Sequence, residues 1–270
     1  LYIPNFRRTA IKIFHALKKD KILALMAVGF LFLMAFLIFI NAIMPINSYD
    51  ALTYHLNRAA YWLSQGNLNH FLTPDDRNLV MPINSEILYT WVLAFLKNDW
   101  GLGFFSFTGY VMSVIALWGI LDVFGFCTRK KLWSVFIISS FASVIAEASS
   151  AETDIILAGL TLSSILFFLF SLKERKNSPI FFAALAYALA AGTKSPAVMV
   201  FPGILLMFLY FSMKKMGKEG IKPVAAFLGF LLLNFLLFAS YNYFLNFINY
   251  GNPLSSPASY EYHRFWGGYK

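Results

Sequence analysis

Residues that could perform chemistry follow one another at helical spacing, just after an apolar run that ends near Met44. Asp50, Tyr54 and Arg58 are each four positions apart, and His55 follows Tyr54 directly. Residues at this spacing share one face of a helix. A carboxylate on such a face can act as a general base, and the neighbouring cations can assist it or hold an anion. The alternative for Asp50 is a structural one, an N-cap at the start of the helix.

A second acidic group, Glu147, Glu152 and Asp154, precedes another apolar run. Placing a carboxylate at the edge of the hydrocarbon layer costs free energy, so its presence there indicates a function. Asp154 could supply a second acid, or the carboxylates could bind a divalent cation through oxygen. The candidate metal ligands are Asp50, Glu152 and Asp154, although the sequence does not identify a cofactor. The alternative for Asp154 is again a helix cap.

A lone lysine, Lys194, interrupts two apolar segments in the sequence Gly192-Thr193-Lys194-Ser195-Pro196. Proline favours the first turn of a helix, so a new helix is expected to begin there. Free backbone amides at a helix start, together with a lysine, make a natural site for a phosphate group. The alternative is a lysine that only extends its amine to the membrane surface.

The elements that position these residues must be membrane helices. The chain is 59% hydrophobic and only 13% charged, and its apolar runs are long enough to cross a bilayer without the alternation of a barrel. Sixteen of the 22 Lys and Arg residues fall in four clusters, each beside an apolar run. This pattern is typical of cytoplasmic loops rather than of a nucleic-acid surface. It predicts an integral membrane protein with a cytoplasmic N-terminus and no nucleic-acid partner.

We expect a single all-α domain over residues 1–270, a polytopic bundle of about seven spans. Residues 1–21 form a basic cytoplasmic lead-in, and residues 44–100 form a first extracytoplasmic loop that carries interfacial helices. Residues 246–270 form an extracytoplasmic tail, which we expect to be truncated. The spans are expected at about 22–43, 101–125, 132–146, 155–171, 179–213 (a hairpin of two short spans, with Lys194 at its turn) and 223–245.

In their order and sidedness these motifs resemble the GT-C superfamily of membrane glycosyltransferases. More narrowly, they resemble bacterial relatives of the protein O-mannosyltransferases and of the aminoarabinose transferase that modifies lipid A. The resemblance covers about residues 22–255. The motifs that carry it are Tyr49-Asp50 with Tyr54-His55, Met81-Pro82, Glu152-Thr153-Asp154 and Gly192-Thr193-Lys194-Ser195-Pro196.

The resemblance implies an enzyme of the bacterial inner membrane that moves a sugar from a polyprenyl-phosphate carrier to an acceptor on the extracytoplasmic side. It assigns the catalytic carboxylate to Asp50, the second acidic residue to Asp154 and a substrate-binding lysine to Lys194. We add Arg58 as a second phosphate ligand, with Tyr54, His55 and Glu152 as further substrate contacts. The implied partners are the sugar lipid, membrane lipids and subunits of a membrane complex.

Two other classes of protein remain open. Relatives often carry a second acid where this chain has Ala51, so a catalytically inactive scaffold subunit is one alternative. The other is a small-molecule or lipid transporter, in which ionisable residues lie within the spans and face a water path. Only Asp122 and Asn234 approach the interior of an expected span, which favours the enzyme over the transporter.

Overall fold

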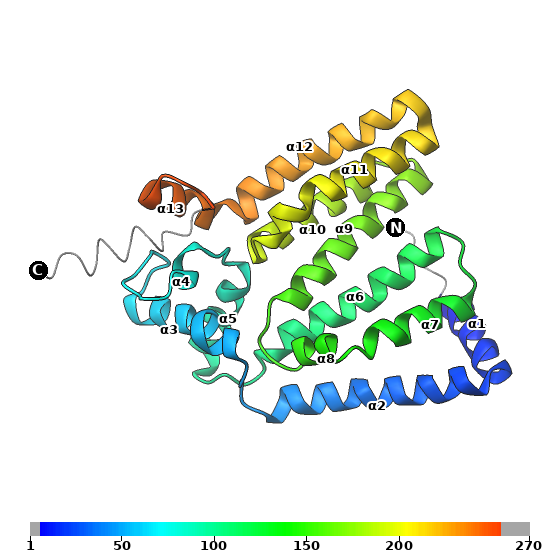
Figure 1. Ribbon diagram of the computed structural model, residues 1–270, viewed down its shortest axis with the longest axis horizontal. Helices are drawn as coiled ribbons and strands as arrows, with labels where there is room; N and C mark the ends of the chain where they lie inside the picture. The colour runs from blue at the N-terminus through cyan, green and yellow to red at the C-terminus, as the bar shows by residue number, and fades with distance from the viewer. Residues whose placement is uncertain (1–5, 255–270) are drawn as a thin grey trace, which may run out of the picture.

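The structure is a computed structural model that describes residues 6–254, and over this range the chain forms helices and no strand (Figure 1). The first half contains α1 (Phe6–Lys19), α2 (Lys21–Ile43), η1 (Ala51–His55), α3 (Leu56–Gln65), α4 (Arg77–Val80), α5 (Asn84–Leu96) and α6 (Gly103–Val123). The second half contains α7 (Thr128–Ser139), α8 (Ala142–Ala148), α9 (Asp154–Glu174), α10 (Ser178–Thr193), α11 (Pro196–Met216), η2 (Gly217–Gly220), α12 (Ile221–Phe238) and α13 (Ser240–Tyr250). The predicted all-α fold is therefore confirmed for the described residues.

Several of these helices are long and apolar enough to cross a membrane. The described residues contain four such stretches, or five if the bent pair α7 and α8 forms one span. The four are Lys21–Ile43, Gly103–Val123, Asp154–Glu174 and Pro196–Phe238, and the last of them includes both α11 and α12. Helix α10 is apolar but shorter than a typical span. The expected total of seven spans remains a prediction.

Close packing of α6 against α9 depends on two glycines. A side-chain carbon added to Gly109 would lie 2.7 Å from the Cα atom of Ile156, and one added to Gly159 would lie 2.5 Å from the carbonyl oxygen of Gly109. Small residues at such a crossing let helix backbones approach closely, which favours helix association in lipid. This contact aligns α9, whose first residue is Asp154, with the rest of the bundle.

Aromatic side chains join α9 to the hairpin of α11 and α12. The ring of Phe168 stacks on that of Phe208 at 3.9 Å between centroids, and Phe227 packs edge-on to Phe208 at 5.0 Å. All three side chains are fully buried. Such pairs add to the energy of burial. The turn at Gly217–Gly220 lets α12 run back beside α11, as Figure 1 shows.

Two of the expected spans differ from the structure. The span expected at 132–146 is broken: α7 and α8 meet at 71° because Phe141 has an extended backbone, and the Ser140 hydroxyl donates to the carbonyl of Ile137 at 2.8 Å. The span expected to reach residue 245 ends at Phe238. The non-helical Ala239 follows it, and the Ser240 hydroxyl donates to the carbonyl of Leu236. The polar α13 then begins in a separate helix.

The stretch expected as the first extracytoplasmic loop forms η1, α3, α4 and α5 at one end of the bundle (Figure 1). Helix α3 packs against α5, with Ala59, Trp62 and Tyr89 buried. Leu52 and Leu63 are exposed on the other side, as a helix at a membrane surface requires. Of the expected tail, residues 246–250 belong to α13, and residues 255–270 lie outside the described part of the chain.

Candidate active site

Asp50 lies at the start of η1, next to a tyrosine that orients it. The hydroxyl of Tyr54 donates to Oδ2 of Asp50 at 3.0 Å. The Tyr54 side chain is buried, whereas 37% of the Asp50 side chain is exposed. Burial, reinforced by the Asp50 charge, raises the pKa of the Tyr54 phenol well above its usual range. The phenol therefore keeps its proton at neutral pH and presents Asp50 to solvent in a fixed orientation.

Arg77 is a second partner of Asp50, and the sequence motifs did not point to it. Its Nη1 atom lies 3.3 Å from Oδ1 of Asp50, and its Nε and Nη2 atoms donate to the carboxylate of Asp75 at 3.0 and 2.8 Å. Its guanidinium also lies 4.8 Å from the ring centroid of Tyr54. The bond to Asp75 raises the pKa of Arg77 above its usual range. A permanent cation therefore lies beside Asp50.

Arg58, the arginine selected from the sequence, is placed differently. Its side chain is 1% exposed, and its guanidinium donates to the backbone carbonyls of Asn78 (2.5 Å), Met81 (2.8 Å) and Arg77 (2.7 Å). Burial lowers the pKa of Arg58 from its ordinary value. The helical spacing did bring Arg58 to the correct end of the molecule. The N–H groups of its guanidinium, however, donate to backbone carbonyls. The geometry therefore does not support the expected contact between Arg58 and phosphate.

His55 is also buried, and it links three elements. Its Nδ1 atom lies 2.6 Å from Oε1 of Glu86 on α5, and its Nε2 atom lies 3.4 Å from the hydroxyl of Thr153. The side chains of His55 and Glu86 are 2% and 0% exposed. The expected contact between His55 and substrate is therefore not supported by this geometry. Glu86 is a buried partner of His55 that its position in the sequence did not reveal.

Asp154 and Lys194 form an ion pair across two helix starts. The Nζ atom of Lys194 lies 2.8 Å from Oδ2 of Asp154. Asp154 is the first residue of α9, and Lys194 lies at the turn before α11. Half of the Asp154 side chain is exposed, but only 14% of that of Lys194. The expected hairpin turn at Lys194 is thus present, with the lysine facing an acidic residue rather than extended into solvent.

The two other acidic residues lie close to this pair. Glu147 is within electrostatic range of Asp154, Glu152 and Lys194. Glu152 is mostly buried, its backbone carbonyl accepts a hydrogen bond from Ser106 at 2.5 Å, and its charge acts on the phenol of Tyr54. The second acidic group therefore forms a cluster around Lys194, with Glu152 toward the first loop.

Direct contacts bring the first loop, the acidic turn and the α10–α11 turn to one end of the bundle. The hydroxyl groups of Ser48 and Ser150 are 2.9 Å apart, and the amide of Asn84 donates to the carbonyl of Leu189 at 3.5 Å. The hydroxyl of Ser195 lies 3.7 Å from the sulfur of Met81. Segments about 100 residues apart in the chain thus meet at the end where Figure 1 shows α3, α4 and α5.

A sequence model of the dolichyl-phosphate-mannose-protein mannosyltransferase family matches residues 86–243 of the chain. This match covers more than half of the 270 residues. The chain belongs to this family. It is accordingly a membrane glycosyltransferase of the GT-C type, which confirms the resemblance drawn from its motifs. No curated protein and no solved structure matches the chain.

The segment matched by the family includes Asp154 and Lys194 but begins after Asp50. Only the three-dimensional contacts connect the first loop to that segment. Glu86, the first matched residue, makes one of these contacts through His55. The family match thus covers Asp154 and Lys194, and the contacts of the first loop place Asp50 at the same end of the bundle as that pair.

The carboxylates of this glycosyltransferase do not form a metal site in the described residues. No group of three His, Cys, Asp or Glu side chains between residues 6 and 254 is arranged to hold a metal ion. Asp50 faces Arg77, and Asp154 faces Lys194. A divalent cation prefers several oxygen ligands with uncompensated charge. The arrangement therefore does not fit the divalent ion that these acidic residues could have bound.

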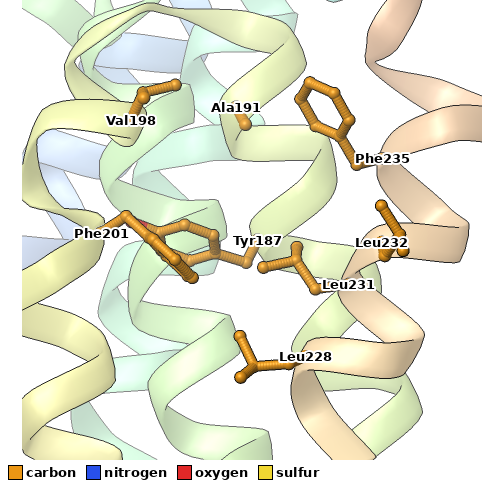
Figure 2. A pocket seen from close by; sticks show the side chains of 8 residues that line it. All are labelled: Tyr187, Ala191, Val198, Phe201, Leu228, Leu231, Leu232 and Phe235. Carbon is orange, nitrogen blue, oxygen red and sulfur yellow. The ribbon is translucent and has the colours of Figure 1, made fainter.

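An apolar groove runs along the hairpin that carries Lys194. Its volume is about 300 Å³. Figure 2 shows Val198 and Phe201 of α11 facing Phe235 and the leucines of α12, with side chains of α10 between them. The groove is lined by Tyr187, Ala191, Val198, Phe201, Leu228, Leu231, Leu232 and Phe235. Ala191 and Val198 lie about one helical turn on either side of Lys194.

Proposed function

We propose that this glycosyltransferase moves a sugar from a polyprenyl-phosphate donor to an acceptor on the extracytoplasmic side of the membrane. The observation that supports this best is the half-exposed Asp50, held by Tyr54 and Arg77 at the same end as the Asp154–Lys194 pair. A carboxylate and two cations at one end of the bundle suit a reaction with a nucleophile to activate and a phosphate to release.

In the proposed reaction Asp50 is the base. The bond between the sugar carbon and the phosphate oxygen breaks, and its electron pair goes to the phosphate. The acceptor oxygen forms the new bond to that carbon, and its proton moves to Asp50. Lys194 and Arg77 stabilise the charge on the departing phosphate. Each of them leaves the protein carboxylate with which it pairs and binds the phosphate instead.

The distribution of basic residues supports the proposed sidedness. Arg129 pairs with Asp20 at 2.8 Å, which joins the start of α7 to the connection between α1 and α2. This contact and the turn after α11, with Lys214, Lys215 and Lys218, lie at the end of the bundle opposite α3–α5 (Figure 1). Because clusters of Lys and Arg favour the cytoplasmic side, the end that carries Asp50 is assigned to the extracytoplasmic side.

The apolar groove supports a lipid-linked donor. A polyprenyl chain is a branched hydrocarbon. The Leu, Phe and Val side chains that line the groove can pack against such a chain by van der Waals contact, and this packing needs no polar partner. The groove is lined by α10, α11 and α12, and Lys194 lies at the turn between α10 and α11. A donor whose phosphate binds Lys194 is therefore proposed to lay the first part of its lipid chain along α11 and α12.

The test is transfer of label from a radioactive polyprenyl-phosphate sugar by the purified protein in membrane-mimicking micelles. Asp50→Asn is expected to lower the rate by at least about 100-fold, the usual contribution of a general base. Glu174→Gln, the same change of charge on the exposed end of α9, serves as the control. Transfer at the wild-type rate by Asp50→Asn would remove Asp50 as the base. Movement of unchanged donor across a bilayer, without transfer, would indicate a transporter.

A further inference from the structure

The short segment that carries Arg77 has an unusual set of hydrogen-bond partners. Arg58 donates to the carbonyls of Arg77, Asn78 and Met81. From the other side, the amide of Asn242 on α13 donates to the carbonyls of Leu79 (2.9 Å), Val80 (3.2 Å) and Met81 (2.8 Å). The amide of Asn246 also donates to the carbonyl of Val80, at 2.9 Å. Every carbonyl from residue 77 to residue 81 thus accepts a bond from a distant side chain.

The donors of these bonds are among the most deeply buried polar side chains of the described chain. Arg58, Asn242 and Asn246 are 1%, 2% and 0% exposed. Burying a guanidinium and two amides costs free energy unless their donors are satisfied. Helix α4 has only four residues, and no further helical turn follows it. Without these side chains its carbonyls would therefore lack hydrogen-bond donors. Because the buried donors and the backbone carbonyls satisfy one another, the backbone of residues 77–81 is held in one specific arrangement.

The segment has one outward-facing charged group near the site, Arg77. Its guanidinium lies between Asp75, Asp50 and the ring of Tyr54. The bond to Asp75 is local in sequence, but the position of Arg77 relative to Asp50 depends on where the backbone of residues 77–81 lies. That backbone is fixed from one side by α3 and from the other by α13.

We infer that Arg58, Asn242 and Asn246 are positioning residues for sugar transfer, which hold the backbone of residues 77–81 so that Arg77 remains beside Asp50. This inference rests on the proposed function. It makes α13, which follows the last candidate span, a part of the active site that acts through the backbone of residues 77–81. Docking of α13 and the transfer reaction are thereby coupled.

A double-mutant cycle tests this coupling, because residues that act through one another do not have additive effects. Asn242→Ala is expected to lower kcat by about 10- to 100-fold, since a misplacement of about 1 Å can cost this much. In an Arg77→Ala background the same change is expected to cost less than about 3-fold. The matched control is Asn252→Ala, an exposed asparagine just after α13 that bonds to the backbone of Leu254.

Hydrogen exchange of the amides near residues 77–81 supplies a second measurement that does not depend on activity. Asn242→Ala is expected to speed exchange there while Asn252→Ala does not. If Asn242→Ala does not fold, Asn246→Ala, which removes a bond to the carbonyl of Val80 and one to that of Pro253, replaces it in both measurements.

Three results would overturn the inference. Equal losses from Asn242→Ala with and without Arg77 would show that Asn242 acts only on stability. Unchanged transfer with faster exchange would show that the segment need not be held. A wild-type protein that transfers no sugar from any polyprenyl-phosphate donor would remove the proposed function and the inference together, whereas an active wild type with additive losses would remove the inference alone.

Discussion

The phenolic oxygen of Tyr54 lies 3.0 Å from the Asp50 carboxylate, and the two residues are four positions apart in a turn of π-helix. Such turns are rare and occur often at functional sites. The tyrosine is buried and the aspartate is half-exposed. The pair is therefore suited to hold a carboxylate in one orientation at the protein surface.

The first prediction concerns this hydrogen bond. Tyr54→Phe keeps the ring that packs against His55 and Arg77 and removes only the hydroxyl. Loss of one hydrogen bond to a charged group corresponds to about 1.5–3 kcal/mol, or a fall in kcat of about 10- to 100-fold. Because the bond orients the base and not the donor, the KM for donor is expected to stay within a factor of about 3. Initial rates over a range of donor concentrations measure both constants.

Tyr61→Phe is the matched control for this change. Tyr61 lies on α3, is partly exposed and stacks on Phe71, so this change removes a tyrosine hydroxyl but leaves the bond between Tyr54 and Asp50 in place. It should retain the wild-type kcat. If Tyr54→Phe raised KM and left kcat unchanged, Tyr54 would be a donor-binding group and its bond to Asp50 would be incidental.

The second prediction concerns the lysine at the α10–α11 turn. Lys194→Ala removes the cation proposed to bind the donor phosphate, so the KM for donor is expected to rise by about 10- to 100-fold, the value of a charge-assisted bond. Lys194→Arg should recover part of this loss. Lys218→Ala, at the opposite end of the bundle, is the control. An unchanged KM for Lys194→Ala would leave the Asp154–Lys194 pair with a structural role only.

Much of this architecture could be predicted from the sequence because membrane helices follow from hydrophobic length and loop charge. The all-α fold, the hairpin turn at Lys194 and the GT-C resemblance are confirmed. Span ends were less predictable. The breaks lie at Phe141 and Ala239, whose backbones leave the helical conformation within runs whose average hydropathy favours continuation.

The choice between the two arginines could not be made from the sequence. Helical spacing alone places Arg58 on the face of Asp50, but the π-helical turn Ala51–His55 lies between them, and Arg58 is buried whereas Asp50 is partly exposed. The role of Arg58 depends on which groups accept hydrogen bonds from its guanidinium. These acceptors are backbone carbonyls within residues 77–81, which follow α3 after a loop of more than ten residues. Arg77 follows Asp75 in a polar loop with no periodicity. Only folding of that loop brings it to Asp50.

The third prediction concerns the buried pair of His55 and Glu86. Glu86→Gln preserves the shape of the side chain but weakens a 2.6 Å hydrogen bond between two buried groups. The expected loss of unfolding free energy is about 1–3 kcal/mol. For a chain of this size, each kcal/mol corresponds to a fall in Tm of about 2–4 °C. Thermal unfolding in micelles measures this change.

An exposed ion pair provides the comparison. Glu219→Gln removes the partner of Lys222 at the surface, where ion pairs contribute about 0–1 kcal/mol. Its Tm should stay close to that of the wild type. Equal Tm values for Glu86→Gln and the wild type would show that the buried charge on Glu86 does not stabilise the joint between η1, α5 and the acidic turn.

The last prediction concerns pH and the docking of α13 through His70. The Nε2 atom of His70 lies 3.5 Å from Oδ1 of Asn242, and its Nδ1 atom lies 3.2 Å from the amide nitrogen of Asn249. A neutral ring with its proton on Nε2 satisfies both contacts, since it donates to the first and accepts from the second. Its ring also stacks on Tyr250 at 5.5 Å. The neutral form of His70 therefore fits this pocket.

Burial lowers the pKa of His70 below its ordinary value of 6.5, and the positive charge of Arg58 acts in the same direction. Because the folded-state pKa lies below the unfolded one, the stabilisation by neutral His70 is complete above pH 6.5 and is lost as the pH falls through the folded-state value. Protonation would place an N–H group of His70 against the Asn249 amide. Acid is therefore expected to loosen α13.

Hydrogen exchange of α13 at about pH 7.5 and about pH 5, corrected for the intrinsic rates, measures this effect across the range in which histidine titrates. Exchange is expected to be faster at the lower pH in the wild type. In His70→Gln, which cannot gain this charge, the difference should largely disappear, whereas His15→Gln on the exposed α1 should keep it. If α13 of the wild type exchanged equally at both values, His70 would not control its docking, and the neutral contacts with Asn242 and Asn249 would not depend on pH.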